Sequence, residues 1–149
     1  MVLRNVTLND IELIFNLANA SNIRKFSGNP KPISWDEHKN WFLKKLADKK
    51  CKFFILEHQG LNIGSIRFDS EENGEMVISY LIEPDFQGKG YGKLILKEGV
   101  ERLKNDKPEI KNVCGFVKKA NTTSIKIFER LGYCKITDDG KILKFEKKL

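Results

Sequence analysis

One stretch, residues 80–97, restricts the possible folds more than any other part of the chain. It reads YLIEPDFQGKGYGKLILK: an apolar strand closed by Pro84, a loop with three glycines, and then an amphipathic helix. Glycine lets the main chain approach a ligand closely, and the N-terminus of a helix carries partial positive charge. Lys89 and Lys93 add full charges nearby. The stretch therefore predicts an anion site, such as a site for a pyrophosphate.

The spacing of the glycines excludes two common phosphate loops. The dinucleotide fingerprint fails because Lys93 stands where its third glycine is required. The nucleoside-triphosphate loop fails because Leu94 stands where serine or threonine is required. What remains is Gln-x-x-Gly-x-Gly over residues 87–92, behind a strand that ends Ile-x-Pro. The alternative is a glycine-rich turn that does no more than start a helix.

Length and charge limit the partners of this site. At 149 residues the chain is expected to form a single domain, residues 1–149, without help from metal or disulfides. The net charge of +7 fits a nucleic acid, an anionic membrane or an anionic small molecule. No RNA-binding aromatic run occurs, and no apolar run reaches the roughly 18 residues of a membrane span. We therefore expect a small-molecule partner, and neither nucleic acid nor membrane.

The cysteines argue against a metal site. Cys51, Cys114 and Cys134 are odd in number, far apart and without Cys-x-x-Cys spacing. We therefore expect no metal and a reducing, cytoplasmic location. The N-terminal residues also lack the long apolar run of a signal peptide.

The order of apolar patterns and turn signals predicts an α+β fold. Alternating or continuous apolar runs predict strands at residues 2–7, 52–57, 63–69, 76–82, 113–117, 133–137 and 142–145. Capping residues and helical spacing predict helices that begin near Asp10, after Ser34, within the central stretch and after Asn121. Residues 19–32 predict a loop, or a short helix followed by a loop. The expected fold is a mixed, mostly antiparallel sheet of about six to seven strands flanked by about four helices.

A second motif follows the fifth predicted strand. It spans residues 117–133 and contains Asn121, the small residue Ser124, the aromatic Phe128 and a Gly-Tyr pair. Together the two motifs resemble the acyl-CoA site of the GNAT superfamily of N-acyltransferases, and the strand order is similar over the whole chain. The resemblance implies a sheet that splays open at its central strands and holds acyl-CoA in the V-shaped gap.

The same resemblance implies contacts with acetyl-CoA. The main-chain N–H groups of residues 87–92 would hold the pyrophosphate, and the exposed main chain of Leu81 and Ile82 would pair with the pantetheine arm. Asn121 is equally well a plain helix cap, and Phe128 is equally well a core residue. The expected contacts are Leu81, Ile82, Gln87, Gly88, Lys89, Gly90, Tyr91, Gly92, Asn121, Ser124 and Phe128.

The implied chemistry is direct transfer of an acetyl group to an amine. The amine must be neutral to attack the thioester, so an ammonium acceptor first loses a proton. The main-chain N–H of Ile82 is the expected donor to the oxyanion. Ser79, Tyr80 and Glu83 lie on the same strand and could line the gap or order a proton-carrying water, and Ser79 or Tyr80 is preferred. Many family members supply a tyrosine as the acid where this chain has Phe128. Tyr133 is the stand-in that the sequence offers.

The N-terminal half indicates the acceptor amine. It resembles acetyltransferases that modify the 4-amino group of a nucleotide-activated amino sugar in pseudaminic acid biosynthesis. The resemblance implies that Arg24, Lys25 or Arg67 binds the diphosphate and that Trp41 or a nearby aromatic stacks on the base. His38 lies on the helix that usually forms the acceptor pocket, although a helix-cap or surface histidine is the alternative. The segments that carry this resemblance are residues 22–27, 33–42 and 64–69.

Two other functions stay open at this point. The His-x-x-Trp-Phe pattern of residues 38–42 also occurs in relatives that acetylate protein N-termini, of the ribosomal-protein-modifying type. The phenylalanine at the usual acid position leaves open an acyl-CoA-binding module without catalysis. Either a monomer or a homodimer fits the sequence.

Overall fold

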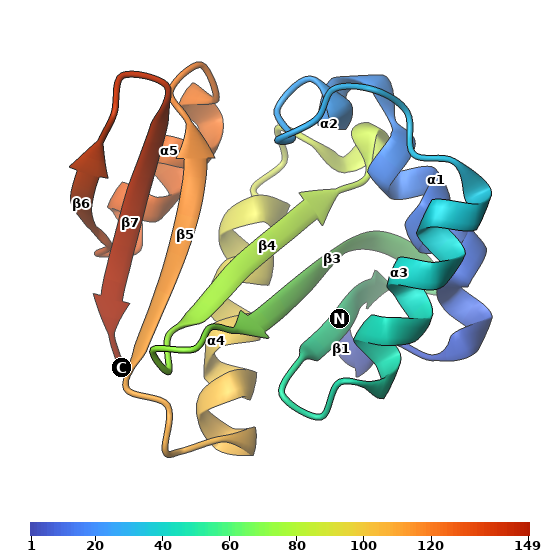
Figure 1. The fold of residues 1–149 in the computed structure, drawn as a ribbon, viewed down its shortest axis with the longest axis horizontal. Coiled ribbons are helices and arrows are strands. Elements are labelled where there is room, and N and C mark those ends of the chain that lie inside the picture. Colours follow the sequence, from blue (N-terminus) through green and yellow to red (C-terminus); the bar gives the residue numbers. More distant parts are fainter.

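A seven-stranded sheet in the order β1-β2-β3-β4-β5-β7-β6 organises the molecule (Figure 1). The computed structural model describes the main chain of residues 1–149 and the side chains of all of them except Ser21 and Asn22. The strands are β1 Val2–Asn5, β2 Lys52–His58, β3 Leu61–Ser70, β4 Met76–Ile82, β5 Asn112–Lys118, β6 Cys134–Asp138 and β7 Ile142–Lys148. The helices are α1 Ile11–Asn19, α2 Ser21–Arg24, α3 Trp35–Ala47, α4 Tyr91–Asp106 and α5 Thr122–Arg130, with short 3-10 turns at Leu8–Asp10 and Pro84–Phe86.

The predicted fold class is confirmed. Each neighbouring pair of strands is antiparallel except β4 and β5, which are parallel. A parallel pair needs a long crossover, and α4 provides it. The one additional helix, α2, has four residues and lies where a short helix before a loop was the expectation.

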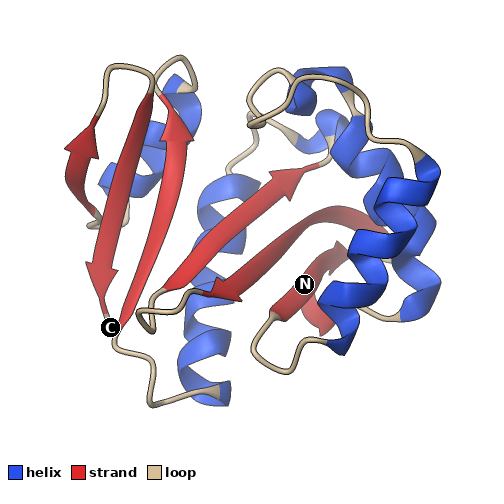
Figure 2. Ribbon diagram, in the orientation of Figure 1, coloured by secondary structure: helices blue, strands red, loops and turns tan.

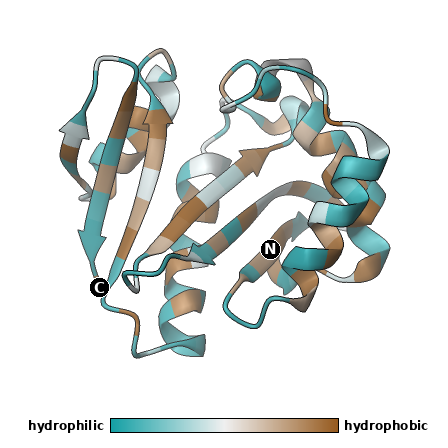
Figure 3. Ribbon diagram, in the orientation of Figure 1, coloured by the Kyte–Doolittle hydropathy of each residue, from teal (hydrophilic) through white to brown (hydrophobic). Residues whose placement is uncertain are grey.

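Helices cover both faces of the sheet, and the alternation of side chains along β2 separates the two cores. Phe54 and Leu56 belong to a cluster with α4 and α5, whereas Phe53 and Ile55 belong to a cluster with α1 and α3. Hydrophobic residues run along β4, whereas the outer turns of α3 are hydrophilic (Figure 3). The sheet is thus the middle layer of three.

The sheet opens between β4 and β5. Parallel pairing joins only Met76–Ile78 to Val113–Gly115, and beyond these residues the two strands diverge (Figure 2). We call the divergent part, Ser79–Ile82 of β4 and Phe116–Lys118 of β5, the fork, and its closed end is the Ile78–Gly115 pair. The splay expected from the resemblance is therefore present at the central strands.

The strand predicted at residues 133–137 begins one residue later than expected, because Tyr133 closes α5 instead. Gly132 has a left-handed φ of 83°, and the N–H of Tyr133 bonds to the carbonyl of Phe128 at 3.0 Å. This is a glycine C-cap of the Schellman type. It turns Tyr133 inward and leaves Cys134 to start β6.

Candidate active site

The glycine loop has the geometry of an anion cradle. Gly88 and Gly90 have φ of 74° and 87°, in the left-handed region that side-chain-bearing residues rarely adopt. Gly90 is the N-cap of α4, and the first main-chain bond of the helix runs from the N–H of Leu94 to the carbonyl of Gly90 at 3.2 Å. The N–H groups of residues 91–93 precede this bond and have no acceptor within the helix. Main-chain N–H groups at a helix N-terminus are typical donors to anions.

Neighbouring side chains hold the loop against the end of β4. The Gln87 side chain donates from Nε2 to the carbonyl of Ile82 at 3.1 Å. The rings of Phe86 and Tyr91 meet edge to face at 5.9 Å, and the ammonium of Lys89 lies 5.6 Å from the Phe86 ring. The loop is therefore braced, and a cation stands beside the cradle.

Gly92 has a second role, in packing. A Cβ at residue 92 would lie 2.8 Å from Cδ1 of Ile127 on α5 and 3.6 Å from Cε2 of Tyr80. A distance of 2.8 Å is shorter than ordinary carbon contacts, so a side chain at residue 92 would require the end of the Ile127 side chain to move. The glycine of the loop that lies inside the helix thus also accommodates the packing of Ile127.

The register of β4 decides which main-chain groups face the fork. The bonds Glu71 N–H to Glu75 O and Glu83 N–H to Ile63 O, both 2.9 Å, bracket the β3–β4 ladder. In an antiparallel ladder, every second residue bonds to the partner strand, so the odd-numbered residues of β4 bond to β3. The main-chain polar groups of the even-numbered residues point away from β3. Tyr80 and Ile82 therefore direct their main-chain polar groups into the fork. Leu81, predicted to pair with pantetheine, directs its own groups to β3, so that prediction is corrected.

Asn121 and Ser124 have partners inside the protein. The Oδ1 of Asn121 accepts from the N–H of Ser124 at 3.2 Å and caps α5. The hydroxyl of Ser124 lies 2.8 Å from the hydroxyl of Tyr80. The structure thus gives Asn121 the helix-cap role, and it makes Ser124 a bridge between α5 and β4.

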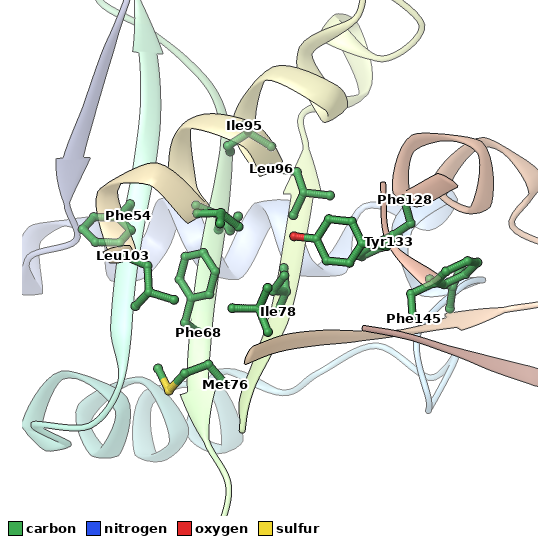
Figure 4. Packing of buried hydrophobic residues seen from close by; sticks show 14 of the residues in the cluster. Phe54, Phe68, Met76, Ile78, Ile95, Leu96, Leu103, Phe128, Tyr133 and Phe145 are labelled. Atoms are coloured by element: carbon green, nitrogen blue, oxygen red, sulfur yellow. The ribbon is translucent and has the colours of Figure 1, made fainter. Parts of the chain in front are cut away.

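The prediction that Phe128 contacts the cofactor is wrong, because Phe128 is a core residue. Its ring is 2% exposed, stacks on Phe145 at 5.4 Å and meets Tyr133 edge to face at 4.9 Å (Figure 4). Tyr133, the predicted stand-in acid, is itself buried in this hydrophobic cluster. Burial raises the pKa of Tyr133.

The two other catalytic candidates, Ser79 and Tyr80, lie on opposite faces of β4. Tyr80 lies on the α4 face, where burial raises the pKa of its hydroxyl and the bond to Ser124 opposes part of that rise. Ser79 lies on the other face, with its Oγ 3.4 Å from an Nη atom of Arg67. Each face of the sheet therefore carries only one of these two hydroxyl groups.

His38 is not in a substrate pocket. It is 1% exposed, and its Nε2 lies 2.7 Å from the carbonyl of Ile11. Four aromatic rings surround it, and burial lowers its pKa. The prediction that it binds substrate is therefore wrong, as is the alternative of a surface histidine. Its neighbours are Phe15, Trp35, Trp41 and Phe42.

The other predicted substrate contacts, Arg24, Arg67 and Trp41, lie in two separate parts of the protein. The guanidinium of Arg24 bonds to the carbonyls of Asn29 and Lys31 and so shapes its own loop. Arg67 lies over the ring of Trp41 at 4.9 Å, and its Nε bonds to Asp69 at 2.7 Å. Since Arg67 covers the Trp41 ring, a base cannot stack on that face as expected.

A cavity of about 510 Å³ lies on the sheet face opposite α4, and sequence reasoning missed it. It adjoins the closed end of the fork, because Val77 and Cys114 are paired there. Its polar wall contains a 3.2 Å ion pair between Glu75 and Lys144. The acidic run around the β3–β4 turn was its only signal in the sequence. The lining residues are Glu71, Glu72, Asn73, Glu75, Val77, Cys114, Phe116 and Lys144.

Hydrogen bonding and burial set the ionisation of this wall. The Cys114 thiol and the Lys144 ammonium both donate to Glu75 and hold the pKa of that carboxyl below its usual range. Burial raises the pKa of Cys114 to about 12, with Glu75 adding to the rise. The wall therefore presents a carboxylate, an ammonium and an un-ionised thiol at neutral pH.

Over the side chains that the structure describes, no three His, Cys, Asp or Glu residues cluster as metal ligands would. Within the same part of the chain, the helices are too short or too polar to span a bilayer.

Comparison with known proteins provides the family and the fold. A family model described as an acetyltransferase (GNAT) domain matches residues 1–134. A domain from Methanocaldococcus jannaschii is 26% identical, with a TM-score of 0.84 over 99% of this chain and 97% of that chain. Spermidine N-acetyltransferase from Vibrio cholerae, in complex with CoA and spermine, is 19% identical with a TM-score of 0.84, covering 99% and 94%. Ribosomal-protein-alanine N-acetyltransferase from Brucella melitensis is 16% identical with a TM-score of 0.82, covering 100% of both chains.

Proposed function

Since the chain belongs to the GNAT acetyltransferase family, we propose that it transfers an acetyl group from acetyl-CoA to a small primary amine. One observation carries the proposal: the glycine cradle of residues 87–92 lies at the end of β4, where the fork frees a strand edge. A diphosphate-bearing thioester requires both an anion site and an extended edge for its arm. Both features meet at Ile82.

The residues of the fork then have distinct tasks. Acetyl-CoA, when bound, supplies an activated thioester carbonyl. The N–H groups of the cradle and the N-terminus of α4 hold the diphosphate. Tyr80 and Ile82 pair with the arm, and the N–H of Ile82 donates to the oxyanion. Ser79, on the cavity side of β4, orders a water that removes the proton of the incoming ammonium.

For the acceptor, we retain the nucleotide-activated amino sugar as the proposed substrate, with Arg67 as its contact. The Asp69 carboxylate fixes the Nε of Arg67, and Trp41 supports the guanidinium plane. The side chain of Arg67 is 20% exposed, so its remaining N–H groups can reach a phosphate. Lys45 also pairs with Asp69 at 2.7 Å, which leaves the cluster with one net positive charge.

The cavity favours a second candidate, a polyamine. Glu71, Glu72 and Glu75 line it against the single cation Lys144. Excess carboxylate attracts a molecule with several ammonium groups. A protein N-terminus of the ribosomal type is the third acceptor to compare, because a solved neighbour bears that name.

The test is an acetyl-transfer screen read by the release of free thiol. The acceptors are a UDP-linked 4-amino sugar, spermidine and a peptide with N-terminal alanine, each with acetyl-CoA. Turnover with the sugar alone supports the proposed acceptor, and turnover with spermidine alone selects the polyamine. Thermal stabilisation by acetyl-CoA without turnover on a wide panel of amines would contradict the proposed catalysis and favour a binding module.

A further inference from the structure

The side chain of Tyr80 crosses the fork on the α4 face. Its hydroxyl reaches Ser124 of α5 at 2.8 Å, and its ring lies 6.2 Å from the ring of Phe128. Ser124 and Phe128 are four residues apart and therefore share one face of α5. A tyrosine from β4 thus places a hydroxyl beside the face of α5 that carries Ser124 and Phe128.

The position of Tyr80 along the strand matches the end of a bound thioester arm. The cradle follows Ile82, at the open end of the fork, and pairing closes the fork at Ile78. An arm whose diphosphate sits in the cradle runs along β4 toward the closed end. The sulfur, at the far end of that arm, therefore lies between the N–H of Ile82 and the side chain of Tyr80.

From this geometry we propose that Tyr80 is the general acid that protonates the departing thiol, with Ser124 as its positioning residue. The inference rests on the proposed acetyl transfer. The carbon–nitrogen bond forms and the carbon–sulfur bond breaks. The amine nitrogen gives one proton to water, Tyr80 gives one proton to sulfur, and water returns one to Tyr80. No electron is gained or lost overall, so no further reactant is needed.

The hydrogen bond to Ser124 suits this role. For Tyr80 to donate to sulfur, Ser124 must donate to the Tyr80 oxygen, and the same bond then stabilises the phenolate that forms. Burial keeps the pKa of Tyr80 raised, so the hydroxyl carries its proton at neutral pH. The alternatives are weaker, because Phe128 has no hydroxyl and Tyr133 is enclosed in the hydrophobic cluster.

The first test uses binding alone and does not depend on finding the acceptor. The ligands are CoA and dethio-CoA, in which hydrogen replaces the thiol. The pKa of the free CoA thiol lies above the value of about 8.5 for cysteine, and a hydroxyl donor binds the thiolate better than the thiol. Such a donor lowers the pKa of the bound thiol, so affinity rises as the pH approaches the pKa of the free thiol. Between pH 7 and pH 9.5, the affinity of the wild type for CoA, relative to dethio-CoA, should rise about fivefold or more. In Tyr80→Phe this ratio should stay constant, and an equal rise in both proteins would overturn the proposal.

The second test is kinetic, with the acceptor found in the screen. Tyr80→Phe should lower kcat by about 100-fold or more and change the KM for acetyl-CoA less than about threefold. Ser124→Ala should lower kcat less, and Ser124→Thr should restore it because the hydroxyl returns. A Tyr80→Phe enzyme with unchanged kcat, or a larger loss in Tyr133→Phe, would overturn the assignment. If the wild type acetylates no amine, the proposed function fails while the binding test still decides the role of Tyr80.

Discussion

Phe128 lies over Gly115, so closely that a Cβ at residue 115 would come within 2.5 Å of the Cζ atom of the ring. Gly115 is also the last residue of β5 that pairs with β4. The contact therefore fixes α5 at the closed end of the fork. It also explains the burial of Phe128, since the ring fills the space that Gly115 leaves over the sheet.

We expect Gly115→Ala to destabilise the protein by about 1–3 kcal/mol, because the ring must shift against Phe145. Chemical denaturation measures this change in the free energy of unfolding. Gly28→Ala is the matched control, since nothing lies within 4 Å of its added Cβ and its φ is not left-handed. Equal stability of the two variants would mean that the close contact is not maintained in solution.

Substitutions of Gly90 and Gly92 should have different effects, one on cofactor affinity and the other on stability. Gly90→Ala strains a left-handed residue by about 1 kcal/mol and reorients the cradle, so the Kd for acetyl-CoA should rise about tenfold or more with little loss of stability. Gly92→Ala instead forces Ile127 away and should lower stability by about 1–2 kcal/mol. Adding Ile127→Val, which removes the clashing Cδ1, should recover part of that loss. Titration calorimetry and denaturation separate the two effects, and wild-type affinity in Gly90→Ala would contradict the cradle.

The ionised carboxylate of Asp10 should stabilise the folded protein at pH values above the pKa of this group. Both of its carboxylate oxygens accept from Arg4 at 2.8 Å, and these bonds hold the pKa of Asp10 below 3.8. A lowered folded pKa means that the stabilisation is present above pH 3.8 and disappears as the pH falls through the folded value. Asp10→Asn should therefore cost about 1–3 kcal/mol at pH 7, and the difference from wild type should shrink below pH 3.8.

Asp106→Asn is the matched control for Asp10. Asp106 also accepts from an arginine, Arg102, but this pair joins residues four apart on the exposed side of α4. Its loss should change the free energy of unfolding by less than about 0.5 kcal/mol at pH 7. A similar cost for both variants would show that the Arg4 pair is an ordinary surface pair.

His38 should make the protein less stable in mild acid. Its folded pKa is lowered from 6.5 by burial, so the unfolded chain binds more protons once the pH falls below 6.5. The free energy of unfolding should decrease between pH 7 and pH 5.5, by no more than about 1.4 kcal/mol per pH unit. In His38→Gln, whose amide can still donate to the Ile11 carbonyl, this decrease should be smaller. Identical slopes in both proteins, measured by denaturation at each pH, would exclude a role for His38.

Local sequence signals predicted the elements well. The expected strand at residues 76–82 has those bounds, and Ser34 caps α3 by accepting from the N–H of Glu37 at 3.2 Å. The glycine loop starts α4 as expected, with Gly90 as the N-cap. These features depend on residues a few positions apart, so a single sequence contains them.

The strands, the helix starts and the glycine loop could be predicted from local patterns, because caps, turns and apolar spacing act between near neighbours. In contrast, the folded molecule was needed to show that Leu81 faces β3, that His38 and Phe128 are core residues, and that Tyr80 meets Ser124. Those facts follow from the register of β4 on β3 and from the docking of α5 on β5. Both depend on contacts between residues far apart in the chain, which no local pattern specifies.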